Sequence, residues 1–181
     1  FGYRMTRKLA LEDASIVARY TLVNLAPFPF RFVWAMHPLM TTVQQAIEVQ
    51  LAPPRAEMRL SHDASGNEVN ETFTWPVLAT TGEDFSRPAE LPAKRGWKVF
   101  STDPIRAPAV IRYPGRGRAV ELGFESEDGI DAYWGIWINT GGWAGHQHLA
   151  LEPTTGRFDQ LDRAVRDHSA GSVAALATTT W

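Results

Sequence analysis

The sequence contains no cysteine, and this absence removes several kinds of chemistry at once. Disulfides, zinc–thiolate centres and thiol nucleophiles are all excluded. No stretch approaches the roughly 18 apolar residues of a transmembrane helix, and no long apolar segment follows the basic residues near the amino terminus. We therefore expect neither a membrane span nor a signal peptide. These features favour a cytoplasmic location without fixing the compartment.

Charge of one sign is also lacking, because 18 Lys and Arg residues face 20 Asp and Glu residues for a net charge of −2. This balance argues against a nucleic-acid partner or an anionic membrane surface. A hydrophobic share of 44% predicts a globular core, and a length of 181 residues suits one domain. Both ends lie inside strand-like patterns, so we expect residues 1–181 to be a single domain taken from a longer chain.

Several catalytic motifs are absent as well. There is no Gly-x-Ser-x-Gly and no His-Glu-x-x-His, which leaves serine-hydrolase and zinc-protease functions without support. The Gly-rich segment 140–145 lacks the Lys and Ser/Thr of a phosphate-binding loop and precedes a strand-like segment rather than a helix.

What the sequence does have is alternation of apolar and polar residues with a period of two. This pattern is typical of strands with one buried face. It predicts strands over residues 3–11, 15–24, 28–34, 46–51, 57–60, 69–75, 109–113, 118–125, 132–138, 148–152 and 173–181. Turn signals at 64–67, 114–117 and 127–129 separate them, and residues 80–95 are expected to form a long surface loop. Phe158, Leu161 and Val165 predict one helix over 157–168. We expect an all-β sandwich or barrel of antiparallel sheets.

His37 and Glu152 are the candidate acid–base pair. Each ends an apolar or aromatic strand and precedes a proline, which favours an extended conformation at the strand end. Histidine titrates near neutral pH, and a carboxylate beside an apolar strand can be tuned for proton transfer. The alternatives stay open: His37 could simply bond a backbone carbonyl, and Glu152 could stabilise a turn.

Other histidines and the tryptophans suggest a ligand surface. His146 and His148 form a His-x-His pair that could hold a metal, but no nearby Asp, Glu or Cys completes a ligand set, so a solvent-facing or sugar-facing pair is favoured. Indole rings stack on sugar C–H faces, although tryptophan also fills the cores of β-sandwiches. Trp143, in the Gly-rich segment, is the best ligand candidate. The other candidates for substrate contacts are Trp34, Trp137 and Asn139.

Two short motifs give the chain a family resemblance. Residues 20–30 (YTLVNLAPFPF), leading to 34–39 (WAMHPL), resemble a signature strand pair of the galactose mutarotase-like superfamily, the aldose 1-epimerase family. Residues 137–142 (WINTGG) and 149–153 (LALEP) resemble its second signature. The resemblance covers most of the chain and corresponds to the carboxyl-terminal portion of the family.

This resemblance implies a β-supersandwich that is incomplete at the amino terminus. It also implies isomerase chemistry on a monosaccharide or sugar-derived ligand, with Glu152 as base and His37 as acid across a gap wide enough for a pyranose ring. It implies no cofactor and no metal. The family's sugar-contacting Asp has no counterpart in residues 96–100 (GWKVF), and Asp103 is close but displaced.

Two alternatives remain beside this enzyme function. One is a non-catalytic carbohydrate-binding or accessory domain of the same fold, favoured by the altered Asp position. The other is a sugar-phosphate epimerase, which needs a basic cluster that Arg112, Arg116 and Arg118 could supply. The sequence does not specify the sugar or the oligomeric state.

Overall fold

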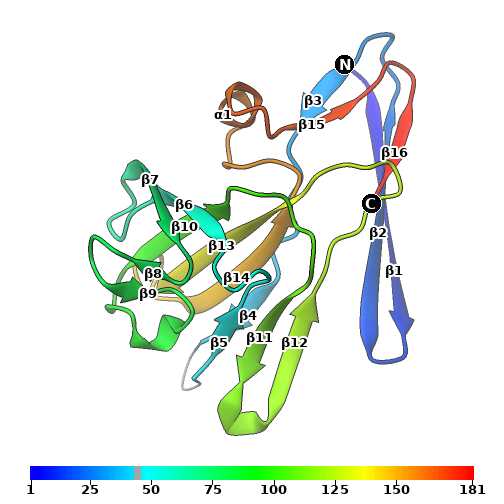
Figure 1. The fold of residues 1–181 in the computed structure, drawn as a ribbon. Helices are drawn as coiled ribbons and strands as arrows, with labels where there is room; N and C mark the ends of the chain where they lie inside the picture. Colours follow the sequence, from blue (N-terminus) through cyan, green and yellow to red (C-terminus); the bar gives the residue numbers. More distant parts are fainter. Residues whose placement is uncertain (43–45) are drawn as a thin grey trace.

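The fold is all-β with one short helix, as the alternation predicts (Figure 1). The structure is a computed structural model, and it describes residues 1–42 and 46–181. The strands are β1 (Tyr3–Glu12), β2 (Ser15–Asn24), β3 (Phe30–Phe32), β4 (Leu39–Thr41), β5 (Glu48–Gln50), β6 (Glu57–His62), β7 (Glu68–Thr74), β8 (Val77–Leu78), β9 (Glu83–Asp84), β10 (Gly96–Ser101), β11 (Ala109–Tyr113), β12 (Arg118–Leu122), β13 (Tyr133–Thr140), β14 (Gln147–Thr154), β15 (Gly171–Val173) and β16 (Thr178–Thr180). The helix is α1 (Leu161–Arg166). None of the described helices is long and apolar enough to cross a membrane.

The largest sheet is antiparallel and six-stranded, in the order β4-β14-β13-β10-β6-β7. Its inner face is apolar and carries Leu149 and Leu151 from β14, Ile136 and Ile138 from β13, and Val99 from β10. These side chains are almost fully buried, so this face is the main hydrophobic core. The opposite, outer face carries the intervening residues of the same strands, because successive side chains point to opposite sides of a sheet.

A three-stranded sheet, β12-β11-β5, closes the core from the inner side. Val49, Ile111 and Leu122 from these strands pack in the same hydrophobic cluster as the inner face of the six-stranded sheet. The two sheets therefore form a β-sandwich, and the outer face of the larger sheet is left for other contacts.

A third sheet, β1-β2-β16, lies beside the sandwich and has a smaller aromatic core (Figure 1). Tyr20 stacks on Trp181 with a centroid separation of 6.0 Å, and Leu22 and Val173 complete the cluster. Every residue of β1 is exposed.

The region 80–95 differs from the predicted surface loop. It contains β9 and a 3-10 turn at Pro88–Glu90, and it buries Phe85 and Leu91 in the main core. Charged residues and prolines dominate this stretch, so its sequence gave little sign that Phe85 and Leu91 pack in the core.

The helix is shorter than predicted and presents a different face. It spans only Leu161–Arg166, because Phe158 has a positive φ of 74° and the chain turns there before the helix begins. Leu161 and Val165 are exposed, whereas Ala164 is buried. Phe158 is buried against the outer face of the sheet rather than on a helical stripe.

Removing side-chain volume from the inner face tests this arrangement. Leu151 is fully buried, so Leu151→Ala should lower the free energy of unfolding by about 2–5 kcal/mol. Leu11 is 82% exposed on β1, so Leu11→Ala should change it by no more than about 0.5 kcal/mol. Urea denaturation of both variants measures the difference, and equal losses would contradict the placement of the core.

Candidate functional site

Strand register brings His37 and Glu152 together on the outer face of the six-stranded sheet. Before His37, Ala35 pairs with Thr154 in an isolated bridge, and after it Leu39 pairs with Ala150 at the start of β4. The intervening His37 therefore lies opposite Glu152. Side chains of directly opposed antiparallel residues share one face with Cβ atoms about 5 Å apart.

The two side chains are in direct contact. His37 Nε2 lies 3.1 Å from Glu152 Oε1; the glutamate side chain is 2% exposed and the histidine side chain 47% exposed. The described residues offer Oε1 no aligned hydrogen-bond donor, so this contact is electrostatic and leaves the oxygen able to accept a hydrogen bond. From the sequence, His37 and Glu152 are expected to face each other across a gap as wide as a pyranose ring. In this structure they are cross-strand neighbours in direct contact, so that expected gap is wrong.

Sequence reasoning did not select Lys98, which holds the other carboxylate oxygen. Its Nζ donates to Glu152 Oε2 at 2.6 Å and lies 3.5 Å from Asp159 Oδ1. Lys98 is only 5% exposed on β10, one strand beyond β13. Gly135 is the residue of β13 that pairs with Glu152, and the place of its missing side chain is bordered by Phe100 and Glu152. Lys98 is the one charged residue in the otherwise apolar and aromatic segment 96–100, and this isolated charge was the sequence feature that could have indicated a buried ion pair.

The segment after β14 folds back over this part of the outer face. Phe158 packs on Phe100, with ring centroids 5.9 Å apart, and places the neighbouring Asp159 beside Lys98. Asp159 is exposed, so one side of the Lys98–Glu152 pair reaches the surface through this residue.

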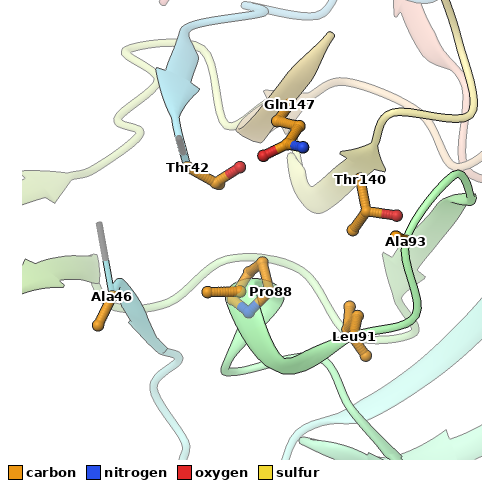
Figure 2. Close-up of a pocket in the computed structure, with 8 residues that line it drawn as sticks. Thr42, Ala46, Pro88, Leu91, Ala93, Thr140 and Gln147 are labelled. Carbon is orange, nitrogen blue, oxygen red and sulfur yellow. The ribbon is translucent and has the colours of Figure 1, made fainter. Parts of the chain in front are cut away.

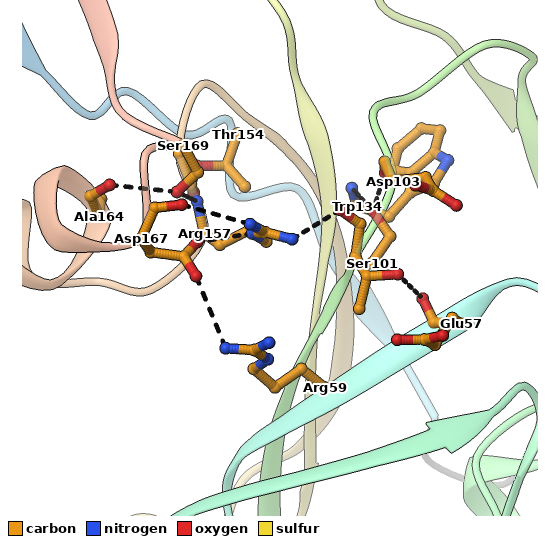
Figure 3. Close-up of polar contacts among 12 residues, drawn as sticks. Glu57, Arg59, Ser101, Asp103, Trp134, Thr154, Arg157, Ala164, Asp167 and Ser169 are labelled. Atoms are coloured by element: carbon orange, nitrogen blue, oxygen red, sulfur yellow. Dashed lines mark hydrogen bonds and ion pairs between the residues drawn. The ribbon is translucent and has the colours of Figure 1, made fainter.

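Arg157 fixes that segment to the sheet (Figure 3). Its Nε donates to Asp167 Oδ2 at 2.7 Å and its Nη1 donates to the Thr102 carbonyl at 2.6 Å. Asp167 also forms an ion pair with Arg59 of β6, with 3.5 Å between Asp167 Oδ1 and Arg59 Nη1. The network joins the turn before α1 to the residue after α1, to strand β6 and to the residue after β10, so partly buried charges hold the segment that carries Asp159.

His148 lies on the same face, two alternate positions before Glu152 on β14. Its Nε2 accepts a hydrogen bond of 3.0 Å from the indole N–H of Trp137. Burial lowers the pKa of His148 below the ordinary histidine value, and the neighbouring imidazoles of His146 and His37 lower it further. Neutral His148 therefore keeps its proton on Nδ1, since Nε2 is used as an acceptor.

The Gly-rich segment after β13 is held by one buried amide. Asn139 Oδ1 accepts hydrogen bonds from the backbone N–H groups of Gly141 and Trp143 at 3.0 and 3.1 Å, and Asn139 Nδ2 donates to the Trp143 carbonyl at 3.1 Å. Asn139 is almost fully buried and its polar atoms are used in this way. It therefore positions the loop, which differs from the direct sugar contact expected from the sequence.

Trp143 itself is 57% exposed although it is a large aromatic side chain. Its indole lies against Gly96, where a Cβ would come within 2.8 Å of the ring, and edge-on to Trp137 at 5.7 Å. Trp137, Asn139 and Trp143 are thus brought together beside His148.

Two other predicted contact residues lie elsewhere. Trp34 packs in the smaller aromatic core, with its ring centroid 4.5 Å from that of Tyr20. Asp103 is exposed, and the contact that it makes is through its backbone carbonyl, which accepts a hydrogen bond from Ser101 Oγ. Neither residue contacts His37 or Glu152 among the described interactions.

The three arginines considered for a phosphate site are also displaced. Arg112 of β11 donates to Gln50 of β5, and Arg116 and Arg118 lie at the exposed turn into β12. These strands cover the inner face of the six-stranded sheet, whereas Glu152 lies on its outer face. The cluster therefore does not border the His37–Glu152 pair.

A cavity of about 360 Å³ lies at the end of β13 and β14, away from the acid–base pair (Figure 2). Among the described residues, no charged side chain lines it. Its lining residues are Thr42, Ala46, Pro88, Ala89, Leu91, Ala93, Thr140 and Gln147. The arrangement carries no acid–base chemistry.

Within residues 1–42 and 46–181, no group of three or more His, Asp or Glu side chains is arranged to hold a metal ion. The His146 and His148 rings lie 6.4 Å apart and tilted. Trp137 donates to His148 Nε2, and the backbone N–H of His146 donates to the Trp143 carbonyl.

Comparison with known proteins gives a likeness of fold. No protein-family model matches the sequence, and no curated protein matches it either. Among solved structures, an Escherichia coli K12 protein described as a "Putative aldose 1-epimerase" superposes with a TM-score of 0.68 at 17% identity, covering 98% of this chain and 57% of that one. The Slr1438 protein from Synechocystis sp. PCC 6803 superposes with a TM-score of 0.62 at 16% identity, covering 100% of this chain and 53% of that one.

The chain has a galactose mutarotase-like fold. It spans little more than half the length of the solved structures that it matches. The resemblance expected from the two sequence motifs is therefore confirmed at the level of the fold, and the mutarotase-like sandwich places His37, Glu152 and Lys98 on one face of one sheet.

Breaking the buried ion pair from one side should be costly. Lys98→Met leaves the Glu152 carboxylate without its buried cation and should lower the free energy of unfolding by about 3–5 kcal/mol. The double variant Lys98→Met/Glu152→Gln should recover most of this loss. As a control, Arg106→Met removes an exposed pair with Asp131 and should cost about 1 kcal/mol or less. A double variant as unstable as Lys98→Met, measured by urea denaturation, would contradict the coupling.

The lowered pKa of His148 predicts that the protein becomes less stable as the pH falls below about 6.5. Above the unfolded-state value of about 6.5, His148 is neutral in both states and contributes no pH dependence. Below it, the unfolded chain binds a proton that the folded protein resists, so stability falls as pH decreases toward the lower folded value. His148→Asn should show a smaller fall between pH 7.5 and 5 in denaturant titrations. His168→Asn, at an exposed histidine, is the matched control; identical falls in both variants would contradict the assignment.

Proposed function

We propose that this chain carries the acid–base pair of an aldose 1-epimerase-like isomerase, which interconverts the anomers of a sugar. The observation that carries the proposal is the approach of His37 to Glu152 on one sheet face, at 3.1 Å, in a mutarotase-like fold. The open acceptor position on Glu152 Oε1 is where a hydroxyl proton could be received.

The chemistry requires two coupled proton transfers. Glu152 takes the proton of the anomeric hydroxyl while protonated His37 gives one to the ring oxygen, and the C1–ring-oxygen bond breaks to give the open-chain aldehyde. Rotation about the C1–C2 bond followed by the reverse transfers closes the other anomer. Each positioned acid or base contributes roughly 10²–10⁴ in rate.

For this reaction His37 must move away from Glu152 to admit the sugar ring. The half-exposed imidazole is the mobile partner, because Glu152 is buried and fixed by Lys98 at 2.6 Å. Lys98 holds the carboxylate through Oε2 and leaves Oε1 facing His37.

Glu152→Gln should remove the base while preserving shape. We expect the acceleration of anomer interconversion, followed by polarimetry with α-D-glucose and α-D-galactose, to fall by roughly 10²–10⁴. His37→Gln should reduce it to a similar degree. Gln160→Ala, an exposed change near the same segment, serves as the control and should keep the rate. An unchanged rate in Glu152→Gln would remove Glu152 from the mechanism.

A second candidate function is a non-catalytic carbohydrate-binding domain with this fold. The observation that favours it is the Lys98–Glu152 ion pair, because Oε2 is already bound by a buried ammonium group while His37 lies against Oε1. Sugar affinity and mutarotation measured on the same sample separate the two functions. Binding without acceleration selects the binding domain, and acceleration selects the enzyme.

A further inference from the structure

Trp143 is an exposed aromatic side chain on the outer face of the sheet, and its position is fixed by neighbouring residues. Trp143 is 57% exposed, yet its backbone is fixed on both sides by the buried Asn139 amide, and its indole rests on the bare backbone of Gly96. Gly66 also lies under the ring edge, with its built Cβ position 3.6 Å from Cζ2. A rigid indole with one supported side and one open side is a stacking surface.

Polar groups beside this indole are oriented as well. Trp137 stands edge-on to Trp143, and its N–H holds His148 through Nε2. The remaining Nδ1–H of His148 is a donor that neither Trp137 nor Asn139 uses. Flat apolar surface next to a fixed, uncharged donor matches a sugar ring, which presents C–H faces and hydroxyl edges together.

The position of this surface relative to the acid–base pair sets the size of the ligand. Glu152 follows His148 by four positions along β14, which is about 13 Å of strand. His37 lies opposite Glu152, at the other end of this stretch from the Trp137–His148 contact. That distance exceeds one pyranose ring, so a single ring at Glu152 does not also cover Trp143.

We propose that Trp143, Trp137 and His148 form a second sugar subsite, and that the ligand of this face is a neutral oligosaccharide whose next ring stacks on Trp143. The inference rests on the sugar-binding part of the proposed function and extends it from a monosaccharide to a longer chain. It requires no step beyond binding, so it holds for an enzyme and for a binding domain alike.

Calorimetric titration with two matched sugar pairs tests the subsite: glucose with maltose, and galactose with lactose. The disaccharide should bind roughly tenfold more tightly than its monosaccharide in at least one pair. Trp143→Ala should abolish this advantage and leave the monosaccharide affinity unchanged, because the loop is held by backbone atoms. Trp143→Phe should retain part of the advantage. Phe28→Ala, at an exposed aromatic on another part of the chain, is the matched control and should retain all of it.

Three results would overturn the proposal: no binding of any of the four sugars, equal affinities within both pairs, or a Trp143→Ala variant that weakens both members alike. The test is separable from the proposed isomerase. Glu152→Gln should keep the disaccharide advantage while losing the mutarotation rate. If the protein binds the disaccharide more tightly but does not accelerate mutarotation, the subsite proposal stands and the isomerase proposal fails. If it accelerates mutarotation but binds both sugars of each pair equally, only the subsite proposal fails.

Discussion

The buried ion pair between Lys98 and Glu152 is the constraint on which the site depends. A carboxylate that is 2% exposed is stable only when a cation or several donors compensate its charge, and Lys98 supplies that charge at 2.6 Å. With one oxygen bound to the ammonium, the other is turned toward His37. The geometry of the His37–Glu152 contact is therefore set in part by Lys98, a third and almost fully buried residue.

Strand register and two neighbouring segments bring the partners of Glu152 into contact with it. The antiparallel register places His37 opposite Glu152, and β10 lies close enough for Lys98 to reach across β13. Phe158 packs on Phe100, and the next residue, Asp159, lies beside the Lys98 ammonium group. Charge, register and packing thus come from four separate segments, and none of them forms the site alone.

Alternation and enrichment in β-branched and aromatic residues predicted most of the longer strands, including β13 and β14, which are buried at nearly every position. Residues 15–24 and 109–113 match β2 and β11 in full. Alternation failed for β10, which is buried on both faces, so apolar and charged residues occur without a period of two. Lys98 was missed for this reason, since a single sequence gives no sign that its partner lies 54 residues away. The contact of His37 with Glu152 was anticipated as a pairing, but its distance depends on strand register, which local patterns do not encode.

Gly135 contributes no functional group, yet the chemistry of this face depends on its lack of one. A methyl group at this position would come within 3.3 Å of Phe100 and 3.4 Å of the Glu152 side chain. Any side chain at residue 135 would therefore push Phe100 or Glu152 aside by a few tenths of an ångström. Such a shift would be passed to the contact between Glu152 and Lys98 and to the packing of Phe158 on Phe100.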